Sequence, residues 1–375
     1  MTLALEEILG DRITEGIVVE KKGCKKRKKV ITFAIGGHPI PDSDSIKSAG
    51  KIIKIMKKAE KNDLVIVCVS GGWTALTSYL PEGITLKELQ KTYTLLLNSG
   101  MTVEQMNIIR NYLSLLGRGK IPMIANHATI VGLIAVDEVE GKPWGPTTYD
   151  SSTPAEAIQI LQDFDLLEKI PISVKKYFVK MIAYKKTLKR LDFQRNSEKV
   201  HNFVVADNIV LCKAAQRAAL NLGISSFILS TSIRGEARDV GRVMASISKE
   251  ISVHHRPFEP PCAIIAGGET TVTITGKSGK GGRNQEMVLS AAQDIQDLKD
   301  VVITSIATDG TDGPIEIAGA IVDDTTIQTI EKVGLNVVEE LNYHNSSFVF
   351  EKICDAIYTF DTATNLMDLI VIYIA

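Results

Sequence analysis

Short apolar runs alternate with longer amphipathic stretches along most of this chain. Leu64–Val69 is a continuous, β-branched run, a pattern typical of a strand buried in a parallel sheet. Leu86–Asn98 has helical spacing, and Thr85 with Glu88 provides a capping box at its start. Ile130–Val136 is another apolar run that predicts a strand. Strands and helices that alternate in this way predict an α/β fold with helices on both faces of a parallel sheet.

The alternation continues to about residue 240. Met123–Asn126 reads as a short strand. Further on, strand Phe203–Ala206, helix Ile209–Leu222 and strand Ser226–Ser230 predict one βαβ unit. The proline-rich stretch His254–Pro261 then predicts a boundary, because proline restricts its own backbone and that of the residue before it. We therefore expect two domains, residues 1–253 and 254–375.

The second domain is predicted to contain four strands and three helices. The strands are expected at apolar runs, and the first helix follows a glycine-rich turn. The predicted strands are Cys262–Ala266, Val272–Ile274, Val301–Ala307 and Leu369–Ile374, and the predicted helices are Asn284–Ile295, Thr325–Val333 and one near Ser346–Ile353.

Composition narrows the class of protein. The chain has 375 residues, 45% of them hydrophobic, which is enough for about two packed domains. The formal net charge is −1, so no overall charge favours nucleic acid. The five cysteines form no CxxC pair, no apolar run reaches membrane-spanning length, and the start lacks a signal-peptide pattern. We expect a cytoplasmic protein that binds a small molecule, without nucleic-acid or membrane partners, and we leave a homodimer open.

One basic segment needs separate treatment. Lys21–Lys29 is rich in lysine and lies between the β-prone runs Ile17–Val19 and Val30–Phe33. A nucleic-acid patch is one reading of such a run. Gly23 and the flanking strands favour a solvated hairpin tip instead.

The segment Gly276–Glu286 has the order strand, glycine-rich turn, cation and helix start. Glycines such as Gly281 and Gly282 let backbone N–H groups converge on an anion, and a helix start adds positive charge. Arg283, followed by Asn284, adds a planar fork of donors that suits phosphate. The alternative is a flexible, solvated hairpin tip.

A second glycine turn follows Leu64–Val69 and contains Ser70, Gly71, Gly72 and Thr74. In open α/β sheets ligands bind beyond the carboxyl ends of strands, and this turn lies at such an end. It can bind an anion through its backbone and hydroxyl groups. It can equally be a tight connection between a strand and a helix.

Two carboxylates, Asp309 and Asp312, follow the predicted strand Val301–Ala307. Carboxylates at this position can hold Mg²⁺ or accept a hydroxyl proton. Asp-Gly pairs are also ordinary turn residues. Other polar residues near predicted strand ends or glycine turns are binding candidates, each with capping, hairpin closure or a solvated face as its structural alternative. They are His38, Arg110, Lys120, Asp137, Asp207, Asn208, Glu269 and Thr270.

In this order, these segments resemble the glycerate 2-kinase family, whose C-terminal part is called the MOFRL domain. The resemblance runs nearly from end to end, and its last motifs are very specific when taken together. The matching stretches are Gly37–Asp42, Ser70–Leu76, Gly83–Leu97, Gly267–Thr273, Gly281–Glu286, Ala307–Gly313 and Ala318–Asp323.

The resemblance implies a Rossmann-like three-layer N-terminal domain and a smaller α/β C-terminal domain, with the active site in the cleft between them. It also implies transfer of the ATP γ-phosphoryl group to the 2-hydroxyl of D-glycerate, with Mg²⁺ or another divalent cation. One alternative is an oxidoreductase acting on hydroxypyruvate or tartronate, which needs an early GxGxxG turn that this sequence lacks. The other is a non-catalytic ligand-binding relative.

Within this hypothesis Arg283 stabilises charge on the migrating phosphoryl group, and Asp309 or Asp312 orients the metal or the accepting hydroxyl. Ser70–Gly72 bind a carboxylate or a phosphate. The chain departs from the family at Trp73, where a glycine is usual, and at its start, where Met1–Val19 corresponds to the middle of the family's first βα unit. The family's early glycine–lysine turn is not found there, which predicts a start further upstream or a substitute cation.

Overall fold

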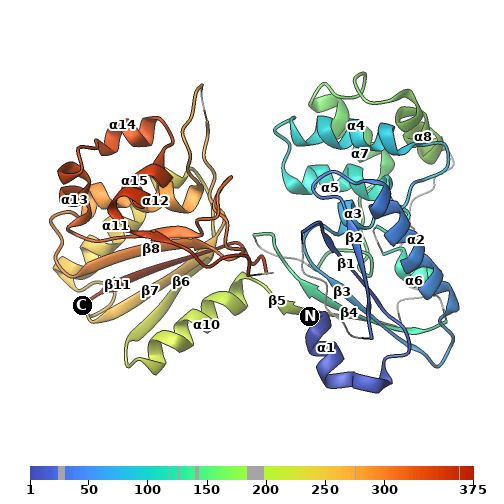
Figure 1. Cartoon of the computed structure of the whole chain (residues 1–375), viewed down its shortest axis with the longest axis horizontal. Coiled ribbons are helices and arrows are strands. Elements are labelled where there is room, and N and C mark those ends of the chain that lie inside the picture. The colour runs from blue at the N-terminus through green and yellow to red at the C-terminus, as the bar shows by residue number, and fades with distance from the viewer. Residues whose placement is uncertain are drawn as a thin grey trace. The chain divides into compact units, whose positions relative to one another are not determined.

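The computed structural model describes residues 1–23, 30–117, 119–125, 127–139, 143–183, 198–274, 276–362 and 364–375. The chain forms two compact units. Unit 1 comprises residues 1–134 and 143–205, and unit 2 comprises residues 135–142 and 206–375. Figure 1 shows the helices and strands of each unit. None of the described helices combines the length and apolar character that spanning a bilayer requires.

The described residues of unit 1 form a two-stranded sheet and a three-stranded sheet. β1 pairs with β2, and β3 pairs with β4 in a sheet of order β3-β4-β5. Its strands are β1 (Ile17–Lys21), β2 (Thr32–Gly36), β3 (Leu64–Val69), β4 (Thr129–Ala135) and β5 (Val200–Ala206). Its helices are α1 (Thr2–Leu9), α2 (Ser43–Lys58), α3 (Trp73–Leu76), α4 (Leu86–Leu97), α5 (Val103–Tyr112), α6 (Ile121–Ile124), α7 (Pro154–Asp163) and α8 (Ile172–Ala183).

Local signals explain where several of these helices begin. Thr85 caps α4 and Thr102 caps α5, each in a capping box with the third helical residue. Asp42 caps α2 in the same way and accepts N–H bonds from Asp44 and Ser45. Buried faces of α4, α5, α7 and α8 then form a helical core around Tyr93 and Phe178.

Two sequence predictions in unit 1 are wrong. Ile17–Lys21 and Thr32–Gly36 pair in parallel, so the basic segment between them is not a hairpin tip, and its residues 24–29 lie outside the described part. Apolar periodicity predicts strands there but not their direction. The predicted strand at Met123–Asn126 is instead the end of helix α6, in which Pro122 occupies the first turn. Asn126 itself is not described.

Unit 2 is built on one six-stranded sheet of order β10-β9-β8-β11-β7-β6. β11 runs antiparallel to both β7 and β8, whereas β6 and β7 are parallel. Helix α10 covers one face and helices α11–α15 cover the other (Figure 1). The strands are β6 (Ser225–Ile233), β7 (Cys262–Gly268), β8 (Val301–Ala307), β9 (Gly319–Val322), β10 (Ala356–Ile357) and β11 (Asp368–Ile374). The helices are α10 (Asn208–Asn221), α11 (Ala237–His254), α12 (Arg283–Ile295), α13 (Thr326–Lys332), α14 (Val337–Asn342) and α15 (Ser346–Ile353).

The predicted boundary at residues 253 and 254 falls inside unit 2. β6 joins the sheet of unit 2 through parallel pairing with β7, and α11 packs on α12. The predicted βαβ unit is therefore divided, because β5 pairs in unit 1 while α10 and β6 belong to unit 2. The proline-rich stretch does separate two elements, because α11 ends at His254 and β7 begins at Cys262. Which unit a segment joins is decided by pairing between strands that are distant in the sequence.

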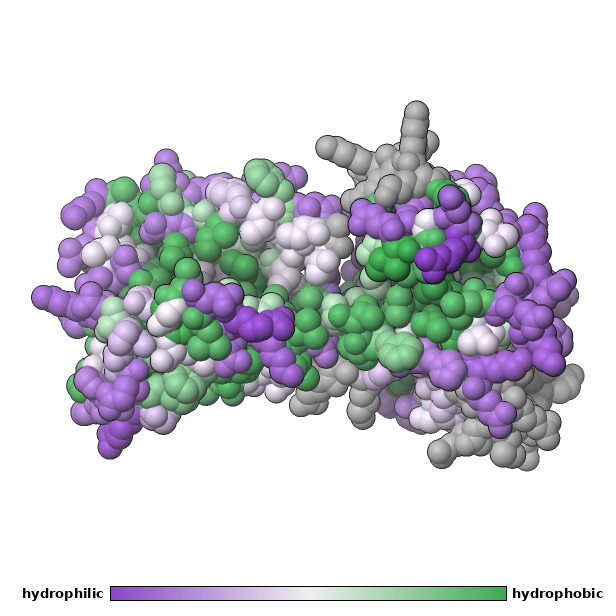
Figure 2. All heavy atoms as spheres, turned by 90° about the horizontal axis from the view of Figure 1, so that it is seen from below, coloured by the Kyte–Doolittle hydropathy of each residue, from purple (hydrophilic) through white to green (hydrophobic). Residues whose placement is uncertain are grey.

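The core of unit 2 lies between the sheet and α11 and α12. Residues of β7, β8 and β11 alternate toward this core, and the α12 residues Met287–Ala292 are all buried. Each unit nevertheless keeps some hydrophobic side chains at its surface, interspersed with polar ones (Figure 2). The predicted strand Val272–Ile274 is absent from the described residues of unit 2, where Thr271 forms only an isolated bridge with Glu236.

Candidate functional site

The strand order of unit 2 gathers polar residues at one edge of its sheet. Because β11 is antiparallel to β7 and β8, its first residue, Asp368, is paired with Gly268 and Ala307, the last residues of those strands. Glu269 follows the end of β7 directly, and Asp309 lies two residues after the end of β8. Three carboxylates from distant parts of the chain thus come to the same edge.

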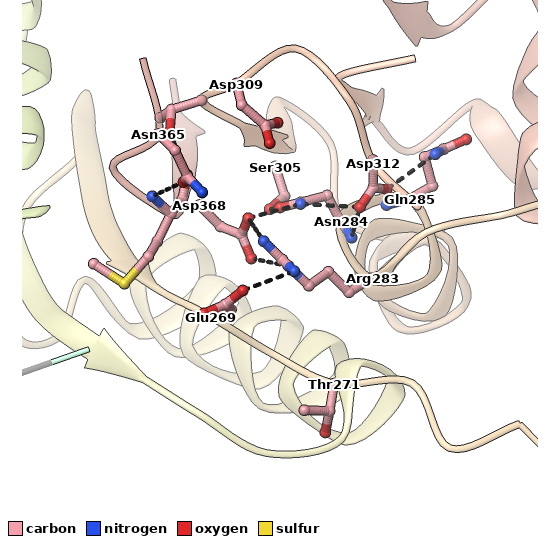
Figure 3. A network of polar contacts seen from close by, with 12 residues as sticks. Glu269, Thr271, Arg283, Asn284, Gln285, Ser305, Asp309, Asp312, Asn365 and Asp368 are labelled. Atoms are coloured by element: carbon pink, nitrogen blue, oxygen red, sulfur yellow. Dashed lines mark hydrogen bonds and ion pairs between the residues drawn. The ribbon is translucent and has the colours of Figure 1, made fainter. Parts of the chain in front are cut away.

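Arg283 is the cation of this cluster. Its Nε and Nη2 donate to the two carboxylate oxygens of Asp368 at 2.7 and 2.9 Å, and its Nη1 lies 2.9 Å from Glu269 Oε1. Figure 3 shows the guanidinium held between these two carboxylates. Such a bidentate pair fixes the orientation of the guanidinium as well as its charge.

The charged groups of the cluster shift the pKa values of Arg283 and Glu269. Burial by itself lowers the pKa of Arg283, but Asp368 and Glu269 outweigh it and hold the pKa above its ordinary value. Burial raises the pKa of Glu269, and Arg283 opposes this effect. The negative charges of Asp368, Asp137 and Asp309 raise the pKa of Glu269 further.

Asp312 holds the start of α12. Its oxygens accept the backbone N–H groups of Asn284 and Gln285 at 3.1 and 2.9 Å, and also both side-chain amides, at 3.2 and 2.9 Å. The residue is 1% exposed. Burial raises the pKa of Asp312, and these donors oppose the shift. The contacts give Asp312 the structural role of a cap for α12.

Asn284 links the two halves of the cluster (Figure 3). Its Nδ2 donates to Asp312 and to Asp368, and its Oδ1 accepts from the hydroxyl of Ser305. Asp309 lies at the rim and is partly exposed, and its Oδ1 accepts the N–H and hydroxyl of Thr311. Asp309 is therefore freer than Asp312 to bind a ligand.

The glycines before α12 are explained by close packing. A Cβ on Gly281 would lie 2.5 Å from the Ser346 hydroxyl, and one on Gly282 would lie 2.2 Å from Asp312 Cγ. These glycines allow the segment to pass against the start of α15 and the loop that holds Asp312. The sequence signal for a glycine-rich anion loop thus has a packing cause at both positions.

Three further candidates in unit 2 have structural contacts. Asp207 caps α10 by accepting the N–H of Val210 at 2.7 Å, as its capping alternative predicted. Asn208 is buried, and its Nδ2 donates to the backbone carbonyls of Leu366 and Asp368 at 2.8 and 3.1 Å. Thr270 is 5% exposed. Asn208 consequently fixes the chain as it enters β11.

Unit 1 contains a second group of candidates, around the turn after β3. Ser70 is exposed, whereas Gly71, Gly72 and Thr74 are partly buried. Gly72 has φ +83°, and a Cβ there would lie 2.9 Å from His38 Cδ2. Burial lowers the pKa of His38, and the charges of Lys21 and Arg110 lower it further. The structure therefore places His38 beside this turn and near Arg110.

Arg110 and Lys120 differ in their surroundings. Arg110 is partly buried, with its Cζ 4.9 Å from the centroid of the Tyr93 ring, so the solvated-face alternative does not hold for it. Lys120 donates to the carbonyl of Ser114 at 2.8 Å. Trp73 also binds this region, through Nε1 to the carbonyl of Leu116 at 3.2 Å. The tryptophan that departs from the family pattern thus anchors the turn.

Sequence reasoning missed several polar residues of unit 2. Asp368 was not singled out, although a polar residue directly before an apolar strand was a usable signal. A second buried network joins Glu286 to Arg238 at 2.5 Å and to His344 Nδ1 at 3.1 Å. Glu286 belongs to a recognised motif, but nothing in the sequence indicated its partners.

The fold defines a protein of two α/β units, with an arginine–carboxylate cluster in the second. Residues 1–179 match a domain of unknown function, DUF4147, and residues 262–368 match the MOFRL family. A Pyrococcus horikoshii protein named glycerate 2-kinase is 39% identical over 99% of this chain and 84% of its own length. A Thermotoga maritima protein named D-glycerate 2-kinase is 34% identical over 99% of this chain and 87% of its own.

A solved structure agrees with these sequence matches. The crystal structure of a glycerate kinase from Thermotoga maritima has a TM-score of 0.87 at 33% identity, covering 99% of this chain and 88% of that one. This chain belongs to the glycerate kinase family. The expected family and α/β fold class are confirmed.

Proposed function

We propose that this chain is an ATP-dependent glycerate 2-kinase. It transfers the γ-phosphoryl group of ATP to the 2-hydroxyl of D-glycerate and releases ADP. The proposal is supported by full-length similarity to proteins named glycerate 2-kinase. The structural observation that carries it is the partly buried guanidinium of Arg283, oriented by two carboxylates at the edge of a sheet.

Arg283 stabilises the charge of the migrating phosphoryl group. A guanidinium has five N–H donors, and three are directed at Asp368 and Glu269, which leaves two for phosphoryl oxygens. The two carboxylates fix the plane of the guanidinium before the substrate arrives. Phosphoryl transfer depends mainly on such positioning and charge stabilisation.

The donor set at the rim of the cluster fits Mg²⁺. Asp309 offers a partly exposed carboxylate, and Mg²⁺ prefers one or two carboxylates together with phosphate oxygens. Asp312 is less suited, because four N–H groups already occupy its oxygens. When bound with the nucleotide, the ion would offset the negative charge of the phosphates. Asp309 would hold it, and the rest of the cluster would keep Arg283 oriented.

The transfer itself needs little covalent help from the protein. The 2-hydroxyl oxygen forms a bond to the γ-phosphorus, the bond to the β-phosphate bridging oxygen breaks, and the hydroxyl proton leaves to a nearby base or water. Glu269 is a suitable base, because burial raises its pKa above the ordinary value of a glutamate and so makes the carboxylate more basic. The turn at Ser70–Gly72 and His38 in unit 1 serve acceptor binding.

The test is a reaction of purified protein with ATP, Mg²⁺ and D-glycerate, with the position of the new phosphate determined by ³¹P NMR. We expect 2-phosphoglycerate. A parallel assay with hydroxypyruvate and reduced nicotinamide nucleotide examines the oxidoreductase alternative, and ATP binding without turnover would indicate a non-catalytic relative. Formation of 3-phosphoglycerate alone would contradict the proposed regiochemistry.

Arg283→Met is the matched variant, since it retains the apolar stem and removes the guanidinium. We expect kcat to fall by roughly 10²–10³-fold, the usual effect of losing one donor that stabilises transition-state charge. Arg217→Met, at an exposed site on α10, is the control and should leave kcat unchanged. Near-normal turnover of Arg283→Met would remove Arg283 from the mechanism.

A further inference from the structure

Arg110 is a partly buried cation for which the described residues provide no carboxylate partner. It lies in the last turn of α5, and its Nη2 donates to the sulfur of Met106 at 3.5 Å. Its Nε is buried and has no hydrogen-bond partner in the described part of the chain. Arg283 and Arg238, by contrast, pair with Asp368 and Glu286. Burying a charged group without a counter-charge costs free energy, so the burial of Arg110 needs a physical reason.

The surroundings of Arg110 bring three segments together. Its guanidinium lies over the ring of Tyr93 on α4, 4.9 Å from the ring centroid. The hydroxyl of Tyr93 donates to the carbonyl of Thr74 at 3.2 Å, which connects that ring to the glycine turn after β3. Gly72 of the same turn packs against His38. All of these contacts lie within unit 1.

These neighbours create a positive environment suited to an anion. Arg110 and Lys21 both act on His38, and their charges disfavour its protonated form. A neutral imidazole can still donate one hydrogen bond. With Tyr93 against one face, the N–H groups of Arg110 remain suited to a planar, doubly accepting anion. Partial burial strengthens such hydrogen bonds relative to those in water.

We propose that Arg110 binds the carboxylate of the acceptor substrate, with Tyr93 positioning the guanidinium and His38 beside it. The inference rests on the proposed function, because D-glycerate supplies a carboxylate next to its reacting hydroxyl. Arg110 then sets the specificity of the enzyme for hydroxy acids over uncharged polyols. The phosphates of the nucleotide share the anionic chemistry, so the experiment must separate the two sources.

The first experiment measures binding of D-glycerate and of ATP to the full-length protein by calorimetry. Arg110→Met keeps the apolar stem over Tyr93, and Arg110→Lys keeps a charge without the planar fork. We expect the Kd for D-glycerate to rise by roughly 10- to 100-fold in Arg110→Met, the effect of losing a hydrogen-bonded charge pair. The Kd for ATP should not change. Arg217→Met is the exposed control.

A steady-state assay provides the second measurement. The KM for D-glycerate should rise in Arg110→Met, the KM for ATP should stay constant, and the preference for D-glycerate over glycerol should fall. Unchanged D-glycerate affinity in a folded Arg110→Met protein would overturn the inference. So would a loss confined to ATP affinity, because it would assign Arg110 to phosphate. If Arg110→Met fails to fold, Arg110→Lys decides the question by the same two criteria.

These outcomes are separable from the test of the proposed function. If the wild-type protein binds D-glycerate through Arg110 but transfers no phosphate, the kinase proposal fails and the carboxylate site stands. If the wild-type protein makes 2-phosphoglycerate and Arg110→Met has normal KM and Kd values for D-glycerate, the kinase proposal stands and the carboxylate site fails.

Discussion

At the scale of single residues, the roles of the acidic groups near α12 differ because their hydrogen-bond partners differ. Asp312 is 1% exposed and accepts four N–H bonds from Asn284 and Gln285. Asp309 is partly exposed, and among the described residues its carboxylate accepts from Thr311 alone. Two aspartates three residues apart thus separate into a structural group and a candidate ligand-binding group.

Asp312→Ala should lower the free energy of unfolding by about 1–3 kcal/mol, because buried amide donors at the start of α12 lose their acceptor. Urea unfolding measures this effect. Asp309→Ala is the matched variant, and its unfolding free energy should change by no more than about 0.5 kcal/mol while kinase activity falls. A stable Asp312→Ala protein would show that the cap is dispensable.

The imidazole of His38 should titrate below the ordinary histidine value of 6.5, because burial and the charges of Lys21 and Arg110 disfavour protonation. Its folded-state pKa is lowered, so the stability it contributes is complete above about pH 6.5 and is lost as the pH falls through the folded-state pKa. NMR titration of the imidazole measures this pKa directly. In Arg110→Met the value should rise, and an unchanged value would place Arg110 too far away to act.

At the scale of elements, continuous apolar runs were the reliable signal. The predicted strands Leu64–Val69 and Val301–Ala307 are confirmed with the same bounds, and helix Ser346–Ile353 forms α15. Val272–Ile274 is not a strand, although its composition favours one, because among the described residues Thr271 alone pairs, with Glu236. Local pattern predicts a β-prone segment but cannot supply the partner that makes it a strand.

The same limit applies to the candidate site. Arg283 was predicted from a local motif, whereas Asp368 lies 85 residues away and reaches Arg283 only because β11 enters the sheet between β7 and β8. No spacing in the sequence indicates that insertion. The site residues found from the sequence are those in local glycine and aspartate motifs, and the missed ones depend on sheet order.

The central position of β11 predicts a large effect of weakening it. Ile372 is 1% exposed and faces the core of unit 2, so Ile372→Ala should cost about 2–5 kcal/mol of unfolding free energy. Because Asp368 begins the same strand, activity should fall along with stability. Ile321→Ala on β9, where the side chain is 38% exposed, is the control and should have a much smaller effect. Equal effects in urea unfolding would contradict the assigned core.

At the scale of the whole molecule, the two proposals give one guanidinium in each unit a distinct role. Unit 2 holds Arg283 among carboxylates, and unit 1 holds Arg110 without a described counter-ion. The proposals divide the ligands accordingly. We assign the charge of the phosphoryl group to Arg283, because two carboxylates fix the orientation of its guanidinium. We assign the acceptor carboxylate to Arg110, because its guanidinium has no counter-ion among the described residues.

Removal of divalent metal should abolish catalysis without unfolding either unit. The described residues contain no group of three or more histidine, cysteine or acidic side chains placed to hold a metal ion. Asp309 contributes one carboxylate, and the nucleotide phosphates supply the remaining strong ligands, as Mg²⁺ prefers. EDTA should therefore stop phosphate transfer and leave the thermal unfolding midpoint unchanged, and added Mg²⁺ should restore activity.

Asp309→Asn should raise the Mg²⁺ concentration needed for half-maximal activity, whereas Asp312→Asn should not. If EDTA lowered the midpoint, the metal would be part of the folded structure and would bind before the nucleotide.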